Sequence, residues 1–367
     1  MVYLGVDLHR KRSHVVALDE KGDVLLSRRI ASRPEDFCRV FGELEPEPLQ
    51  VAFEAAYGWS WLADLLADCG IEAHMAHPLA TKAISAGRVK NDTVDARTLA
   101  HLLRANLLPE AWIALPQVRE ARRLVRMRAS LVRIGSRLRC QIHALLAEHG
   151  VQVEHADLFG PAGRRFLASL HLPEISQRRM EANLRLIDAV AGEVESADRE
   201  LRGLFSAGDP RLRRLLAIPG VGFITAVTVL VEVGEIGRFP DADRLCSWAG
   251  LTPTERSSAE HVRRGHISKQ GSRWLRWVMV EAAQHVRDPE LLRFFERIAQ
   301  RRGKKIARVA LARRILTLCF YALRDEGGCR AYPPQRAKSR SRAIAHALGR
   351  GALAFRHGLL IDGRAID

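Results

Sequence analysis

The feature of this sequence that most constrains its fold is a change of hydrophobic periodicity near residue 116. Before this point, short apolar segments of the β type alternate with helical ones. After it, from 116 to 206, apolar residues recur at intervals of three and four. A period of two indicates strands and a period of 3.6 indicates helices. The chain is therefore predicted to combine an α/β domain with long antiparallel helices.

The first region, residues 1–115, is predicted to hold a central mixed sheet. VYLGVD (2–7) and LQVAFE (49–54) have the composition of short strands, and the segment HVVALDEKGDVLL is predicted to form a β-hairpin that turns at Lys21-Gly22-Asp23. GWSWLADLLADC (58–69) has helical spacing, and the segment IEAHMAHP after it is predicted to be another strand. This order of strands and helices predicts an α/β domain.

Three further regions follow. Residues 116–206 are predicted to form an antiparallel helical, coiled-coil-like region that dimerises and binds nucleic acid, with helix breaks at Gly160-Pro161 and Leu172-Pro173. Residues 207–328 are predicted to form a second, mostly helical unit. Residues 329–367 form a basic tail that can lie along nucleic acid.

The charge of the chain narrows the class of partner. The 367 residues have a formal net charge of +16, so nucleic acid is the first candidate partner; the alternative is an arginine-rich surface that is merely solvated. Eight arginines but one acid lie between Arg119 and Arg139, and we expect Arg126 and Arg133 of this run to contact phosphates. Scattered cysteines, with no signal peptide and no membrane-length apolar run, predict a cytoplasmic protein.

Four acidic residues occupy positions where ligands are commonly bound. Asp7 and Glu54 end predicted strands, and Asp92 and Asp95 lie on one face of the first turn of a predicted helix. Each acid alone is more typical of a cap or turn. Together they are typical of RNase H-like nucleases, in which a divalent cation, Mg²⁺ or Mn²⁺, offsets the repulsion of the carboxylates and promotes phosphodiester chemistry.

Two motifs in the third region are candidates for contact with nucleic acid. The sequence LLAIPGVGFITA predicts a helix-hairpin-helix whose loop, with Gly220 and Gly222, offers backbone N–H groups to a phosphate. An ordinary connection between two helices is equally consistent with this sequence.

The second motif contains two serines. Ser257 and Ser258 are predicted to lie in a basic loop, where they are either polar surface residues or include a nucleophile. Trp274 and Trp277 are interpreted as core rather than base-stacking residues. The cations that follow the serines are candidate phosphate ligands: Arg263, Arg264, Lys269 and Arg273.

The motifs GVDLH (5–9), FEAAYGW (53–59), HPLATKAISAGRVKNDTVDARTLA (77–100), LLAIPGVGFITA (215–226) and WAGLTPTERSSAEHVRRGHISKQGSRWLR (248–276) occur in a characteristic order. In this respect the chain resembles the DEDD transposases of insertion sequences, which include Piv-type DNA invertases and bridge-RNA-guided recombinases. The resemblance implies an N-terminal RuvC-like domain whose acidic tetrad is Asp7, Glu54, Asp92 and Asp95.

The same resemblance implies a nucleophilic serine in the third region. Counting from the proline of the AGLTP motif gives Ser258, with Ser257 as the second choice, and Ala259 stands where glycine is common in the family. It also implies a homodimer or tetramer, DNA as substrate, guidance by a structured non-coding RNA, and a prokaryotic protein associated with the nucleoid. Two alternatives remain open: a RuvC-like junction nuclease that uses water, and a non-catalytic protein that packages nucleic acid.

Overall fold

The computed structural model of the protein describes residues 1–84, 92–206, 208–258 and 261–332, and for residues 256–258 and 261–264 it describes only the backbone. The chain divides into two compact units, Met1–Pro116 and Gln117–Asp367. Most of the predicted basic tail, residues 333–367, lies outside the described residues. Within the described ranges, no helix has both the length and the apolar character needed to span a bilayer.

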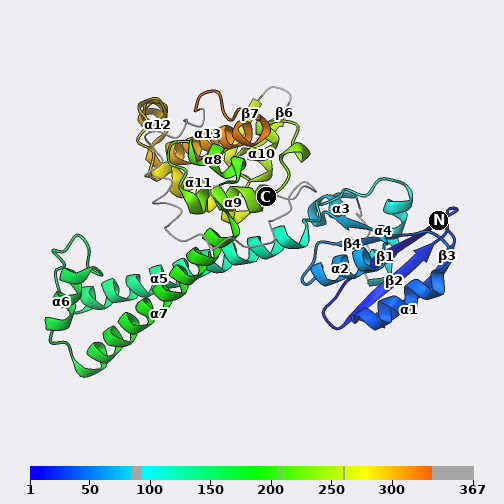
Figure 1. Ribbon diagram of the computed structural model, residues 1–367, viewed down its shortest axis with the longest axis horizontal. Helices are drawn as coiled ribbons and strands as arrows, with labels where there is room; N and C mark the ends of the chain where they lie inside the picture. The colour runs from blue at the N-terminus through cyan, green and yellow to red at the C-terminus, as the bar shows by residue number, and fades with distance from the viewer. Residues whose placement is uncertain (85–91, 207, 259–260, 333–367) are drawn as a thin grey trace. The chain divides into compact units, whose positions relative to one another are not determined.

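The N-terminal unit is built on a five-stranded mixed sheet with the order β3-β2-β1-β4-β5 (Figure 1). β1 pairs antiparallel with β2 and parallel with β4, β2 pairs antiparallel with β3, and β4 pairs parallel with β5. The predicted hairpin is confirmed: β2 and β3 are joined through a turn in which Gly22 has φ 95°. The strands are β1 Val2–Asp7, β2 Arg12–Leu18, β3 Val24–Ala31, β4 Leu49–Glu54 and β5 Glu72–Ala76.

Both faces of this sheet are covered by helices. Val15 and Ala17 of β2 belong to one apolar cluster with residues of α1 (Pro34–Leu44) and α2 (Ser60–Asp68). Val16 and Leu18 of the same strand point the other way, onto α4 (Asp92–Arg104). A short helix, α3 (Pro78–Ile84), precedes α4. Successive strand residues thus alternate between two buried layers, which explains the consecutive apolar residues in the central strands β1 and β4 and in the second half of β2.

Helix α1 is absent from the sequence-based prediction. Its apolar residues Phe37, Val40 and Phe41 are buried and have helical spacing, and Pro34 stands at its first turn. The signal is therefore present in the sequence, although it extends over only three turns.

The second unit begins with two long helices that run side by side, α5 (Pro116–Glu148) and α7 (Glu174–Leu204), joined through α6 (Pro161–Ser169) (Figure 1). The predicted breaks are confirmed, because Pro161 opens α6 and Pro173 is the N-cap of α7. At the end where α6 packs, Ile142, Leu167 and Met180 share a separate apolar cluster.

The rest of the unit is a helical bundle that carries a β-hairpin. The other end of the long helices enters its core, since Ala121, Leu124 and Leu201 share one apolar cluster with α9 and α13. The sheet of β6 and β7 is antiparallel. The elements are α8 Pro210–Leu216, α9 Phe223–Val233, the 3₁₀ turn η1 Ile236–Arg238, α10 Ala242–Trp248, β6 Pro253–Ser258, β7 His261–Ile267, α11 Arg273–Gln284, α12 Pro289–Arg302 and α13 Lys304–Arg324.

Candidate active site

The candidate site lies at the edge of the N-terminal sheet that is formed by the C-terminal ends of β1 and β4. As predicted, β1 ends at Asp7 and β4 ends at Glu54. These strands are parallel neighbours, and their register pairs Val6 with Phe53, so the next residues along the two strands are Asp7 and Glu54. Parallel strands are about 4.8 Å apart, which places the backbones of the two acids side by side.

A helix brings the second pair of acids to the same edge. The first turn of α4 contains Asp92 and Asp95, as predicted. The backbone of α4 approaches β1 closely at Gly5, where an added Cβ would lie 2.0 Å from the carbonyl oxygen of Ala96. No side chain other than hydrogen fits between the two elements at this point. Gly5 therefore allows α4 to pack directly on β1, with its first turn beside Asp7.

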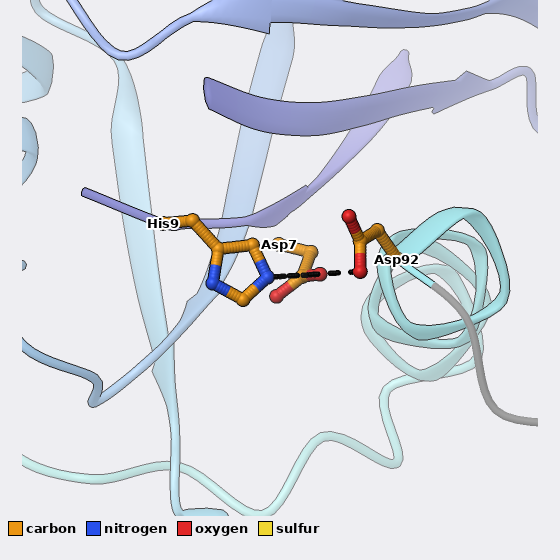
Figure 2. A group of neighbouring side chains, drawn as sticks. All are labelled: Asp7, His9 and Asp92. Atoms are coloured by element: carbon orange, nitrogen blue, oxygen red, sulfur yellow. Dashed lines mark hydrogen bonds and ion pairs between the residues drawn. The ribbon is translucent and has the colours of Figure 1, made fainter. Parts of the chain in front are cut away.

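Three side chains meet at this edge (Figure 2). The Nε2 atom of His9 lies 3.1 Å from Oδ2 of Asp7 and 3.8 Å from Oδ1 of Asp92. One ligand atom from each of the three residues lies within 4.8 Å of the others, and in the described part of the chain this is the group that is placed to share a metal ion. Arg29 approaches the other carboxylate oxygen of Asp92, with its Nη2 atom 3.8 Å from Oδ2.

The structure therefore brings together two of the four predicted acids, with a histidine that the sequence analysis did not select. Glu54 and Asp95 are outside the three-residue group, although Asp95 is near enough to act electrostatically on Asp7. A signal for His9 exists in the GVDLH motif, because the residue follows two positions after the first acid.

The charges at this edge alter the protonation of Asp7. Partial burial raises the pKa of the Asp7 carboxyl above its usual value, and the nearby carboxylates of Asp92 and Asp95 raise it further. His9 acts in the opposite direction and lowers it. The ionised form of a carboxylate that is destabilised by desolvation and by like charges is stabilised by any cation that binds beside it. The donor set, two carboxylates and an imidazole, suits a divalent metal ion.

The predicted nucleophile lies in the second unit. Ser257 and Ser258 do not lie in the loop that the sequence predicted; strand β6 contains both residues and ends at Ser258. In the hairpin register Ser258 is opposite His261 and Arg256 is opposite Arg263. The hairpin is rich in polar residues on both strands, so it lacks the apolar alternation that predicts a strand. The side chains of the two serines, Arg263 and Arg264 are outside the described part of the structure.

Cations and aromatic rings gather where β7 leads into α11. Lys269 is exposed, with φ 55°. The guanidinium carbon of Arg273 lies 4.6 Å from the ring centroid of Trp274, and that of Arg133 on α5 lies 6.0 Å from the same ring. Trp277, one turn further along α11, is 38% exposed. The interpretation of this residue as core is therefore wrong, and its ring is open to solvent.

Arg126, another predicted phosphate contact, is engaged within the fold. Its Nε and Nη2 atoms donate to the two carboxylate oxygens of Glu232 at 2.7 and 2.9 Å, and Glu232 is 2% exposed. Its neighbour Arg122 donates to the carbonyl oxygens of Val231 and Glu232 at the end of α9. Both arginines thus stabilise the C-terminal end of α9, where the helix dipole is negative. A phosphate contact by Arg126 stays a prediction.

The segment that predicts a helix-hairpin-helix forms two helices, α8 and α9, joined by residues 217–222. Gly220 has φ 84°, and a Cβ at this position would lie 2.6 Å from the carbonyl oxygen of Ala282 on α11. Gly222 is exposed, and nothing lies within 4 Å of the Cβ position. The two glycines therefore differ: Gly220 packs the loop against α11, whereas Gly222 faces solvent. Phosphate binding by this loop stays a prediction.

Comparison with protein families covers both units. A family described as DEDD transposase of the IS110 type matches residues 4–150, which include the acidic site. The Transposase IS116/IS110/IS902 family matches residues 212–296, which include the β6–β7 hairpin. Together the two matches span more than half of the chain.

Individual relatives agree with these families. A probable family 20 transposase of Pseudomonas aeruginosa is 24% identical over 348 residues, covering 88% of this chain and 97% of the relative. The transposase for insertion sequence element IS1111A of Coxiella burnetii is 26% identical and covers 84% of this chain and 86% of the relative. The pilin gene-inverting protein of Moraxella bovis is 31% identical over 31% of this chain and 37% of its own length. The chain therefore belongs to the DEDD transposase family of insertion sequences, and it is a DNA transposase.

Proposed function

We propose that this transposase cuts and rejoins the DNA strands of an insertion sequence with a divalent cation, Mg²⁺ or Mn²⁺, held by Asp7, Glu54, Asp92 and Asp95. The observation that carries the proposal is the approach of Asp7 and Asp92 from a strand end and a helix start to within reach of one cation. Glu54, at the end of the adjacent parallel strand, and Asp95, on the same helix face as Asp92, are the further ligands in this proposal.

The bound cation would neutralise the carboxylates and stabilise the charge of a reacting phosphodiester. The protein's own residues position the reaction. The α4–β1 packing at Gly5 fixes the separation of the carboxylates. In the second unit, Lys269 and Arg273 are exposed and follow the β6–β7 hairpin in the chain, and in this proposal their positive charge attracts the DNA backbone.

We assign the nucleophile to Ser258. In the proposed step the Oγ of Ser258 attacks a DNA phosphorus, so that an Oγ–P bond forms while the bond from phosphorus to the departing sugar oxygen breaks. The hydroxyl proton is transferred to that departing oxygen, which leaves as a free hydroxyl. The phosphoserine bond keeps the energy of the broken linkage, and reversal of the step on another strand rejoins DNA. The place of Ser258 at the last position of β6 supports this assignment.

The partners in the proposal are DNA, a structured non-coding guide RNA and further copies of the chain as a dimer or tetramer. Exposed cations support a large polyanionic partner. Lys304 and Lys305 open α13 next to Arg301 and Arg302 at the end of α12, and all four side chains are exposed. The resemblance to bridge-RNA-guided relatives supports RNA as one such partner, and the long helices α5 and α7 offer a surface for association.

A covalent-adduct assay tests the nucleophile. Full-length protein is incubated with labelled DNA that carries an element junction, and protein-linked DNA is separated under denaturing conditions. We expect Ser258→Ala to abolish the adduct and strand transfer, while the matched control Ser257→Ala retains both. Adduct formation by Ser258→Ala together with its loss in Ser257→Ala would move the assignment to Ser257. Cleavage without any adduct in the wild type would identify a nuclease that uses water.

Sequencing of RNA that purifies with the protein tests guidance. We expect one discrete RNA encoded beside the transposase reading frame. A random sample of cellular RNA would contradict the proposal and indicate affinity for polyanions in general.

A further inference from the structure

The side chain of His9 has no role in the tetrad, yet it lies at the centre of the acidic site (Figure 2). Its ring is 55% exposed, so it is not a core histidine held by apolar packing. The same nitrogen, Nε2, approaches the carboxylates of both Asp7 and Asp92, which lie on the same side of the ring (Figure 2). One ring atom is thus close to two carboxylates that belong to different elements.

Hydrogen bonds hold the backbone of His9 in place. The hydroxyl of Ser32 donates to the carbonyl oxygen of His9 at 2.7 Å, and it also bonds the hydroxyl of the buried Ser13 at 2.8 Å. The loop between β1 and β2 is therefore tied to the end of β3. A ligand on an anchored loop loses little conformational freedom when it binds a metal, which favours binding.

The distances between these atoms are compatible with ligands of one metal ion. For metal–ligand bonds of about 2.1 Å at right angles, adjacent ligand atoms are about 3.0 Å apart, and opposite ones about 4.2 Å. The separation between Nε2 of His9 and Oδ2 of Asp7 is 3.1 Å, and that between Nε2 and Oδ1 of Asp92 is 3.8 Å. The first value matches that for adjacent ligands, and the second lies between the values for adjacent and opposite ligands.

We propose that His9 is a direct metal ligand through Nε2, and that it makes this site favour Mn²⁺ over Mg²⁺. The inference rests on the proposed metal centre and goes beyond its four carboxylates. Mg²⁺ prefers oxygen ligands and retains its water, whereas divalent transition metals bind imidazole more readily. A site with one nitrogen donor therefore gains affinity for Mn²⁺ relative to a site made of carboxylates alone.

The test measures Mn²⁺ and Mg²⁺ binding to the full chain without DNA, by calorimetry and by pulsed electron paramagnetic resonance of bound Mn²⁺. We expect a ¹⁴N coupling typical of a coordinated imidazole in the wild type. His9→Gln should remove this coupling and weaken Mn²⁺ binding by about tenfold or more, with a smaller effect on Mg²⁺. The matched control is His14→Gln: His14 is opposite Asp7 on β2 but bonds Ser27 at 3.3 Å, so its loss should leave the coupling unchanged.

The possible failures are distinguishable. If His9→Gln retains the coupling and the affinity while Asp7→Asn loses Mn²⁺ binding, the metal centre stands and the role of His9 is refuted. If the wild type binds neither ion, both the centre and the role of His9 are refuted. An equal loss of affinity for both ions in His9→Gln, with the nitrogen coupling absent from the wild type, would show that His9 only positions Asp7.

Discussion

The ion pair between Arg126 and Glu232 yields a quantitative prediction about the basic helix α5. Glu232 is 2% exposed, and both of its oxygens accept hydrogen bonds from the Arg126 guanidinium. Removing one partner of a buried pair costs about 3–5 kcal/mol. Arg126 itself is 41% exposed, so water reaches part of the vacated space. We therefore expect Arg126→Met to cost less than this range, about 2–3 kcal/mol of unfolding free energy. For a unit of this size such a loss lowers the melting temperature by about 4–12 °C.

Thermal and urea unfolding of the full chain, together with nucleic-acid affinity at several salt concentrations, measure this effect. The double variant with Arg126→Met and Glu232→Gln should recover most of the stability, because the buried charge is then removed with its partner. Arg133→Met is the matched control on the same helix: Arg133 is exposed beside Trp274, so its loss should weaken binding and leave the melting temperature within about 2 °C. An unchanged melting temperature in Arg126→Met, with reduced affinity, would refute the structural role of the pair.

Two further predictions concern the loop before α9 and the acidic site. Gly220→Ala should destabilise the second unit by about 2–4 kcal/mol in urea unfolding, because the new methyl group meets the α11 backbone at a positive φ; Gly222→Ala should cost about 1 kcal/mol or less, and equal effects would contradict this distinction. Asp7→Asn should stabilise the metal-free N-terminal unit at pH 7. The folded-state pKa of Asp7 is raised, so its ionisation opposes folding. This cost is complete above the folded-state pKa, decreases as the pH falls through that pKa, and is gone below the unfolded-state pKa. The advantage of the Asn variant in urea unfolding with EDTA should therefore shrink toward acidic pH, and lower stability of the variant at pH 7 would refute the argument.

The basic helix shows where reading charges along the sequence is insufficient. Between Arg119 and Arg139 the local sequence supplies one acid, which favours phosphate contacts. In the folded chain, Arg126 pairs with Glu232 and Arg128 pairs with Asp198, which is seventy residues away. These carboxylates come from α7 and α9. Their distance in sequence hides them from any count made within a window along α5.

In the acidic site, by contrast, the positions of the carboxylates could be predicted from the local sequence. The sequence predicted that Asp7 and Glu54 end strands and that Asp92 opens a helix, and all three are confirmed. These positions follow from local periodicity and capping, which depend on neighbouring residues. The inclusion of His9 could not be deduced in the same way, because a histidine after a strand has no periodic signal of its own.

The sequence by itself determined the order of elements, the helix breaks at prolines and the presence of four acids at element ends, since these depend on backbone preferences within a few residues. Only the tertiary structure decided which side chains meet. The parallel register of β1 and β4 sets Asp7 beside Glu54, and the close packing of α4 at Gly5 brings Asp92 to Asp7 and His9. Such contacts depend on how separate elements pack against one another, and packing is fixed by the fit of whole surfaces rather than by any short stretch of sequence.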